Sequence, residues 1–230
     1  MAILNIRIIG DPVLRTVADP VTEFGPELAR LVADMTETME DVEGAGLAAP
    51  QVGVSLRVFT YRIGGTEGHI INPVLENSDD FQPDEVEGCL SIPGLGFPVR
   101  RFRATRVTGV DVNGNPVSVD AEGMLARCFQ HETDHLDGIL FTDRLEGEDR
   151  KAALRSIRNA NYDSVTERTT AKRAKTVGSS FGGGSFGTGT SGTSTTGTAT
   201  SGPGTSGTGT QGTGTLANGT PGAGSVGAAG

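Results

Sequence analysis

The stretch FQHETDHLDG, Phe129 to Gly138, places His131 and His135 four residues apart, with Glu132 beside the first histidine. Residues four apart lie on one face of an α-helix, so both imidazoles can reach one metal ion. Glu132 would then lie close to a water molecule bound to that ion. Because the chain has only three histidines, two at this spacing form a specific signal. The stretch therefore predicts a central helix that carries a metal site.

Two histidines do not complete a metal site, and several residues are candidates for the third ligand. No histidine follows His135, which excludes a third histidine downstream. His69 lies in a β-like run, where a strand-surface or core role explains it equally well. Asp137 and Asp143 are near in sequence, but a helix end and a loop account for them.

The two cysteines are the stronger candidates, and helix geometry separates them. Cys128 shares the predicted helix with both histidines but lies about 10.5 Å along the axis from His135, at about 1.5 Å per residue. A metal–thiolate bond spans only about 2.3 Å, so we expect Cys128 to be a small apolar residue near the site. Cys89 comes from a separate segment, EGCLSIPG, and is the predicted third ligand. Three protein ligands and one water molecule are typical of a catalytic site.

The segments around this helix predict an α+β fold with antiparallel or mixed sheets. Gly25 to Glu43 has the spacing of a helix whose apolar stripe packs in a core, and EGAGLAAPQVG ends it. The runs SLRVFTYRI and HIINPVLEN read as strands, and Asn113-Gly114 predicts a hairpin. We expect Asp120 to cap the metal-site helix, and Arg150 to Asn159 to form a last helix.

Composition divides the chain into a catalytic domain, residues 1–175, and a tail, residues 176–230, rich in Gly, Ser and Thr. The tail has no charged residue, and we expect it to be disordered, because it cannot bury enough apolar surface to offset the entropy of ordering. An inert solvated appendage and a partner-binding segment are the two roles open to it.

The formal net charge of −9 belongs entirely to the first 175 residues. An acidic domain does not favour nucleic-acid binding, and the short basic cluster AKRAK, Ala171 to Lys175, is expected to be a solvated helix end or linker. The first residues lack the pattern of a signal peptide, and no run has membrane-spanning length. We therefore expect a cytoplasmic protein whose cysteines are not paired in a disulfide.

Three segments in order, GAGLAAPQ, EGCLS and QHETDHLDG, resemble the three motifs of the peptide deformylase family. The resemblance covers roughly Ile3 to Ala160. It implies an α+β metallohydrolase that removes the formyl group from N-formylmethionyl peptides of nascent proteins. Those peptides are the implied partners, together with a transient contact with the ribosome, and we expect a monomer without membrane or specific nucleic-acid binding.

The resemblance also implies roles for individual residues. Cys89, His131 and His135 match the metal ligands, and Glu132 matches the general acid and base. Gln51 and the backbone N–H of Leu90 match the donors that hold the carbonyl oxygen as it becomes anionic, and Gly46 matches a backbone position beside the substrate. Two departures are Pro50, where some members have Thr, and the loop LGFPVRR, in which the basic substrate contact of some relatives has no assigned counterpart.

Leu47, Leu125 and Cys128 are candidates to line an apolar slot for the methionine side chain, with ordinary core packing as their alternative role. Two imidazoles and a thiolate suit Zn²⁺, whereas the resemblance implies Fe²⁺ as the usual metal. We expect Fe²⁺, with Zn²⁺ or Ni²⁺ able to substitute.

Two other functions share part of this pattern. A general metallopeptidase also carries His-Glu-x-x-His, but a cysteine ligand argues against it. A binding module stabilised by a structural metal needs neither Glu132 nor Gln51, and both are present.

The composition of the tail generates a first prediction. Ending the chain after Val177 should leave the melting temperature and deformylase activity almost unchanged, because the removed residues are expected to contribute no packing. Thermal unfolding and formate release, measured on the full and the shortened chain, test this. A large loss of either quantity would mean that the tail packs against the domain.

Overall fold

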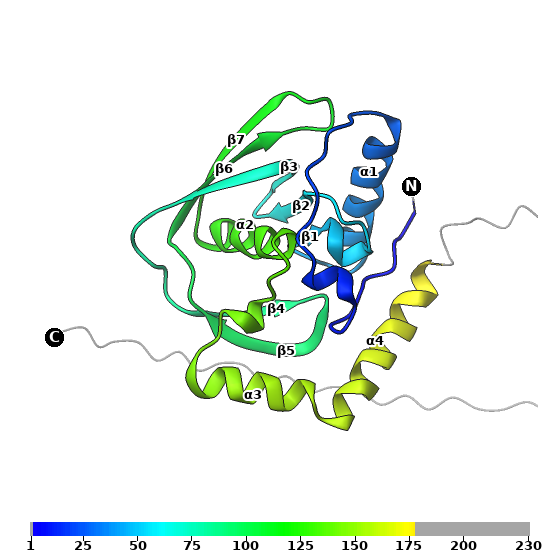
Figure 1. The fold of residues 1–230 in the computed structure, drawn as a ribbon, viewed down its shortest axis with the longest axis vertical. Helices are drawn as coiled ribbons and strands as arrows, with labels where there is room; N and C mark the ends of the chain where they lie inside the picture. Colours follow the sequence, from blue (N-terminus) through cyan, green and yellow to red (C-terminus); the bar gives the residue numbers. More distant parts are fainter. Residues whose placement is uncertain (1, 178–230) are drawn as a thin grey trace, which may run out of the picture. The chain divides into compact units, whose positions relative to one another are not determined.

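The computed structural model describes residues 2–177, in which two antiparallel sheets and four α-helices are arranged around helix α2 (Figure 1). The helices are α1 (Pro26–Asp41), α2 (Gly123–Leu136), α3 (Gly147–Ile157) and α4 (Ala160–Val177), and the short 3₁₀ turns are η1 (Pro12–Arg15), η2 (Ala49–Val52) and η3 (Phe141–Asp143). The strands are β1 (Gly46–Ala48), β2 (Val58–Ile63), β3 (Thr66–Asn77), β4 (Glu85–Cys89), β5 (Ile92–Val99), β6 (Ala104–Val110) and β7 (Pro116–Glu122).

The larger sheet has five strands in the order β1-β2-β3-β6-β7. Tight turns set its register: Gly64 and Gly65, both with positive φ, join β2 to β3. The predicted hairpin at Asn113-Gly114 joins β6 to β7, and Asp111 fixes it by accepting hydrogen bonds from the backbone N–H groups of Asn113 and Asn115. The α+β class with antiparallel sheets is therefore confirmed.

Helix α2 lies between the five-stranded sheet and the two-stranded ribbon of β4 and β5, as Figure 1 shows. Its Phe129 is fully buried against the sheet, with the ring centroids of Phe59 and Tyr61 at 5.7 and 4.9 Å. Burial of such aromatic side chains contributes much of the stability of a small core. This packing holds the opposite face of α2, with its histidines, toward β4.

Helix α1 covers a different part of the sheet. Met35 and Met39, one turn apart on its apolar stripe, are buried against Leu47, Val58 and Ile71. The predicted helix from Gly25 to Glu43 and its core-facing stripe are thus confirmed, with ends one or two residues inside the expected limits.

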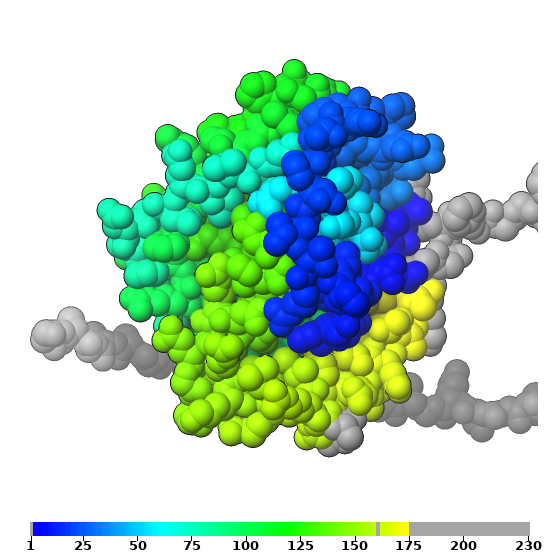
Figure 2. Space-filling model, in the orientation of Figure 1, coloured from blue at the N-terminus to red at the C-terminus, as the bar shows by residue number. Residues whose placement is uncertain are grey.

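The N-terminal segment runs across one face of the domain, beside the residues of α2 (Figure 2). It is fixed by backbone hydrogen bonds from Arg7 N–H to Gln51 O at 2.7 Å, from Ile9 N–H to Ser91 O at 2.8 Å and from Ala18 N–H to Leu136 O at 2.8 Å. One extended segment therefore ties together η2, the β4–β5 turn and the end of α2.

The start of α2 corrects the sequence-based expectation. Asp120 does not cap the helix: it lies in β7 and pairs with Arg106 at 2.6 Å. The strand continues to Glu122 because Ala121 still faces the core, and Gly123, with a φ of +57°, makes the turn into the helix.

Helix α4 was not predicted as such. The last predicted helix, Arg150 to Asn159, corresponds to α3, and α4 follows it directly and contains the basic cluster Ala171 to Lys175. Its sequence is largely polar, so it lacks the apolar periodicity that marks a helix, and Tyr162 is its buried side chain in the core. The predicted disordered tail lies, from residue 178, outside the described residues.

Candidate metal centre

The β4–β5 ribbon and helix α2 bring Cys89, His131 and His135 together. One ligand atom from each residue lies within 4.8 Å of the other two, and the Cys89 Sγ is 3.2 Å from His135 Nε2. Among residues 2–177 this is the one cluster of three such side chains. Cys89 ends β4, whereas both histidines lie one turn apart on α2.

Glu87 orients the first of these histidines. Its Oε2 lies 2.9 Å from Nδ1 of His131, so a neutral imidazole donates its Nδ1–H to the carboxylate and leaves Nε2 free as a metal ligand. Glu87 and Cys89 are two apart on β4, and both contact the histidines of α2: Glu87 lies against His131 and Cys89 against His135. Sequence reasoning missed Glu87, although its spacing of two residues from Cys89 in EGC offered a signal.

Glu87 is itself buried and held by two arginines. Arg101 forms a bidentate pair with it, at 2.8 and 2.9 Å, and Arg127 donates to it at 3.0 Å. Burial alone would raise the pKa of Glu87, but the hydrogen bonds from Arg101 and His131 lower it to about 2. Glu87 therefore stays ionised as the acceptor for His131.

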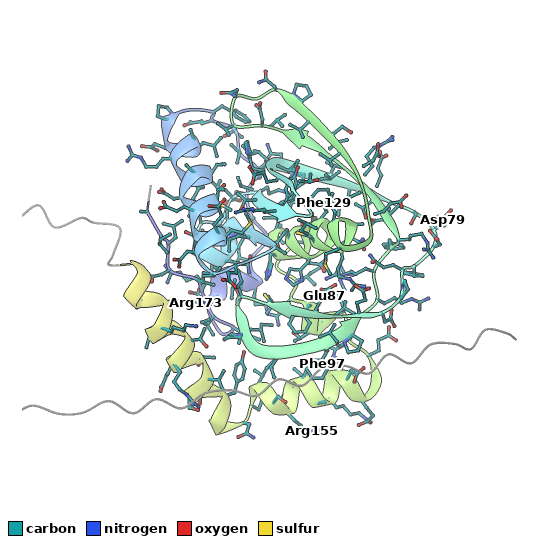
Figure 3. All side chains as sticks on the ribbon, turned by 180° about the vertical axis from the view of Figure 1, so that it is seen from behind. Asp79, Glu87, Phe97, Phe129, Arg155 and Arg173 are labelled. Atoms are coloured by element: carbon teal, nitrogen blue, oxygen red, sulfur yellow. The ribbon has the colours of Figure 1, made fainter. Side chains whose placement is uncertain are left out.

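The same network reaches the next turn of α2. Arg101 also pairs with Asp134 at 2.7 Å, and Arg144 binds the same carboxylate. Figure 3 shows Glu87 on β4, on the side of the ribbon turned toward α2. Buried arginine–carboxylate pairs thus fix the distance between the strand that carries Cys89 and the helix that carries the histidines.

Gln51 is the polar side chain that η2 contributes to the site. Its Oε1 accepts a hydrogen bond from Ala48 N–H at 2.8 Å, which directs the Nε2 donor toward Ser91 Oγ at 3.3 Å and Cys89 Sγ at 3.7 Å. Leu90 follows Cys89 in the turn between β4 and β5 and lines the same cavity. A side-chain amide from η2 therefore lies beside the cluster, and the main-chain N–H of Leu90 directly follows Cys89.

Glu132 is almost completely buried, and its Oε2 has no hydrogen-bond partner among the described residues. Burial raises the pKa of Glu132 to about 7, against the lowering influence of His131 and His135. Buried polar atoms without partners are rare in stable proteins, and such an atom indicates a functional group. Gly46 lies directly against this carboxylate: a Cβ on Gly46 would be 2.5 Å from Oε1, so a side chain there would displace Glu132.

The two cysteines differ in their surroundings. Burial would raise the pKa of Cys89, but the charge of His135 and hydrogen bonds with both histidines hold it well below its ordinary value. Burial and the nearby Glu132 raise the pKa of the Cys128 thiol. Cys128 Sγ lies near the carbonyl oxygen of Ala45 at 3.6 Å and is not one of the clustered ligand atoms. A thiolate forms readily at Cys89 and not at Cys128.

A cavity of about 710 Å³ opens on this cluster. Its apolar lining includes Val86, Leu90, Leu95, Met124 and Cys128. Sequence reasoning did not identify Val86 and Met124, which are exposed at 68 % and 51 % and therefore resemble ordinary surface residues until the fold brings them together.

The other candidates lie elsewhere. Leu47 is fully buried in the core beneath α1, and Leu125 packs against the cluster around Phe129, so neither lines the cavity. His69 accepts a hydrogen bond from Val112 N–H, Asp137 pairs with Arg57, and Asp143 pairs with Arg15. The alternative roles given to these residues agree with their positions.

A family model of polypeptide deformylase matches residues 3–151. This chain belongs to the polypeptide deformylase family. A peptide deformylase of Acidothermus cellulolyticus is 51 % identical over 180 residues, covering 78 % of this chain and 99 % of that protein. One from Parafrankia sp. is 54 % identical over 165 residues, covering 71 % of this chain and 90 % of that protein.

Solved structures of family members share the fold. The crystal structure of a peptide deformylase from Legionella pneumophila has a TM-score of 0.66 and 40 % identity, and covers 74 % of this chain and 99 % of that one. A peptide deformylase from Synechococcus elongatus in complex with actinonin has a TM-score of 0.64 and 39 % identity, and covers 68 % of this chain and 86 % of that one.

The family is metal-dependent, and the residues present fit a metal ion. One thiol of lowered pKa and two imidazoles, one of them oriented by a carboxylate, form a donor set for a divalent transition metal.

The contrast between the cysteines gives a prediction about metal binding. Cys89→Ser should lose bound metal and nearly all turnover, whereas Cys128→Ser should keep the metal with at most a modest change in substrate affinity. Metal per chain and formate release, measured on proteins prepared without air, test both. A full metal complement in Cys89→Ser together with its loss in Cys128→Ser would contradict the assigned ligand set.

The carboxylate behind His131 gives a second prediction. Glu87→Gln should weaken metal affinity about 10- to 100-fold, because a neutral amide orients and polarises the imidazole less well. Glu85→Gln is the matched control: Glu85 lies two residues earlier on the same strand, its side chain is exposed, and its carboxylate approaches Arg127 only to 3.8 Å. Metal titration against a competing chelator measures both variants, and equal affinities would contradict this role for Glu87.

Proposed function

We propose that this chain is a peptide deformylase that hydrolyses the formamide bond of N-formylmethionyl peptides on nascent proteins, releasing formate and a free amine. The observation that carries the proposal is the buried, unpartnered Glu132 carboxylate beside the cluster of Cys89, His131 and His135. A structural metal site needs no free carboxylate next to its ligands. Membership of the deformylase family gives the reaction its class.

We assign the metal to Cys89, His131 and His135, with Fe²⁺ as the native ion and Zn²⁺ or Ni²⁺ as substitutes. A divalent ion held there supplies Lewis acidity, which polarises a carbonyl and lowers the pKa of water toward neutrality. Elemental analysis of protein purified without air or chelators tests the identity of the ion.

Glu132 moves the proton in this mechanism. Its free Oε2 accepts a proton from the attacking water as the new C–O bond forms. The same oxygen then returns the proton to the nitrogen of the leaving amine as the C–N bond breaks. The atoms balance: one water molecule and one formamide give an amine and formic acid, which ionises to formate.

Gln51 and Leu90 stabilise the developing charge. As the formyl carbon becomes tetrahedral, its oxygen gains negative charge, which fixed donors bind more strongly than the ground-state carbonyl. The Gln51 Nε2–H is held in place by the hydrogen bond of its own carbonyl to Ala48 N–H, and the main-chain N–H of Leu90 follows Cys89. Neither donor needs to reorganise during the reaction.

The cavity fits the first residue of such a substrate. Val86, Met124 and Cys128 offer an apolar lining for an unbranched thioether side chain. Gly46, which has no side chain, lets the substrate backbone approach Glu132. In residues 2–177 no helix has the length and apolar character needed to cross a membrane.

We also propose, from the resemblance to the deformylase family, that the protein acts in the cytoplasm as a monomer in transient contact with the ribosome.

The proton-transfer role gives the deciding experiment. Glu132→Gln should keep its metal and release formate at least about 10²-fold more slowly, because it can no longer accept a proton. Formyl-Met-Ala and a peptide without a formyl group but with a susceptible internal bond should be assayed side by side. Near-normal formate release by the metal-loaded variant, or cleavage of the internal bond instead, would overturn the proposal.

A further inference from the structure

Helix α4 forms one wall of the cavity that holds the metal cluster. Thr169 and Arg173 line it together with Gly44 to Gly46, the β4–β5 ribbon and α2. Figure 3 shows Arg173 on the side of α4 that is turned toward the body of the domain. The helix lies beyond residue 151, where the match to the family model ends. Its contribution to the site therefore comes from a segment outside the matched family model.

Arg173 is only partly satisfied in this position. One guanidinium nitrogen, Nη1, donates to the carbonyl oxygen of Leu90 at 3.0 Å. A guanidinium has five N–H donors, and within residues 2–177 no carboxylate forms an ion pair with Arg173. Asp41 and Glu43 line a neighbouring depression with Arg173, yet neither pairs with it.

A half-buried cation without a paired carboxylate is costly, because it loses hydration and gains only the more distant charge of the Cys89 thiolate. The other arginine of the cavity, Arg127, differs in this respect. It is nearly fully buried, its Nη1 and Nη2 donate to Glu87, Val99 O and Pro83 O, and its Nε, which has no hydrogen-bond partner among the described residues, is itself buried. Of these two arginines, Arg173 is therefore the one whose remaining donors are available to a ligand.

The cavity also has more room than the reacting group needs. At about 710 Å³ it lies within the range of sites that enclose drug-sized ligands, so residues after the methionine can extend along it. The peptide segment that follows the formylmethionine offers a carbonyl oxygen at each residue. Those acceptors are present whatever the sequence, as a general processing enzyme requires.

We propose that Arg173 of α4 is a positioning residue that binds a main-chain carbonyl oxygen of the substrate beyond its methionine, and that α4 is thereby a wall of the peptide-binding site. This inference rests on the proposed deformylase function. By anchoring one guanidinium nitrogen to Leu90 O, the side chain holds its other donors at a fixed place beside the β4–β5 turn. Binding there adds affinity for peptides over single amino acids without taking part in bond breaking.

Two substrates separate this role from others. N-formylmethionine methylamide ends directly after the methionine carbonyl, whereas formyl-Met-Ala-Ser continues into the region of Arg173. With the metal-loaded full chain, Arg173→Ala should lower kcat/KM for the tripeptide about 10-fold, since a hydrogen bond to a charged group contributes about that factor. The loss should lie in KM, with kcat unchanged, because the contact is equally strong in ground and transition states. The methylamide should be unaffected.

Two further variants sharpen the test. Lys172→Ala removes the adjacent, exposed cation of the same helix and should leave kcat/KM unchanged for both substrates. Arg173→Lys keeps the charge but not the planar fork and should recover part of the loss.

Equal losses on both substrates would overturn the proposal, because Arg173 would then act through Leu90 and not through the peptide. Unchanged kinetics on both substrates would also overturn it. Absence of formate release by the unmodified protein on the methylamide would instead refute the proposed function itself, so the two failures are distinguishable.

Discussion

The buried pairing of Glu87 with Arg101 and Arg127 is the interaction on which the site depends. It joins β4, which carries Cys89, to α2, which carries both histidines. Removing one partner of such a buried network typically costs about 3–5 kcal/mol, because the remaining charge is left without compensation. A charged network of this kind adds less to stability than an apolar core of equal volume would. What it provides here is a fixed geometry: His131 is aligned by the same carboxylate that the arginines hold.

The five-stranded sheet and the β4–β5 ribbon hold helix α2 by different kinds of interaction. The five-stranded sheet and Phe129 fix one face of α2 through apolar packing, which resists displacement in all directions but does not orient polar groups. The β4–β5 ribbon lies on the other face, where hydrogen bonds of defined direction orient the ligands. The N-terminal segment joins both parts by binding Gln51 and Ser91 through their backbone carbonyls. The proposed oxyanion donors are therefore supported by residues far from them in sequence.

Helix α4 shows how a polar segment can belong to an active-site cavity. Its sequence gives no apolar stripe, and its basic cluster was expected to be solvated, yet Arg173 reaches Leu90 O and lines the cavity. A long arginine side chain can cover apolar surface with its stem while its guanidinium remains in a polar environment. That property does not appear in hydrophobic periodicity.

The sequence alone determined the parts that depend on local spacing. His131, Glu132 and His135 follow from the period of the helix, and the turn at Asn113-Gly114 follows from its residue types. The axial distance between Cys128 and His135 argued against Cys128 as a ligand and left Cys89 as the better candidate. The order of the three motifs was enough to indicate the family. Only the tertiary structure decided which groups from distant segments come together: Glu87 pairs with Arg101 and Arg127, Val86 and Met124 line one cavity, and Arg173 donates to Leu90 O. It also placed Leu47 in the core and Asp120 in a strand. These contacts depend on the packing of sheets and helices, and spacing along the chain carries no information about that packing.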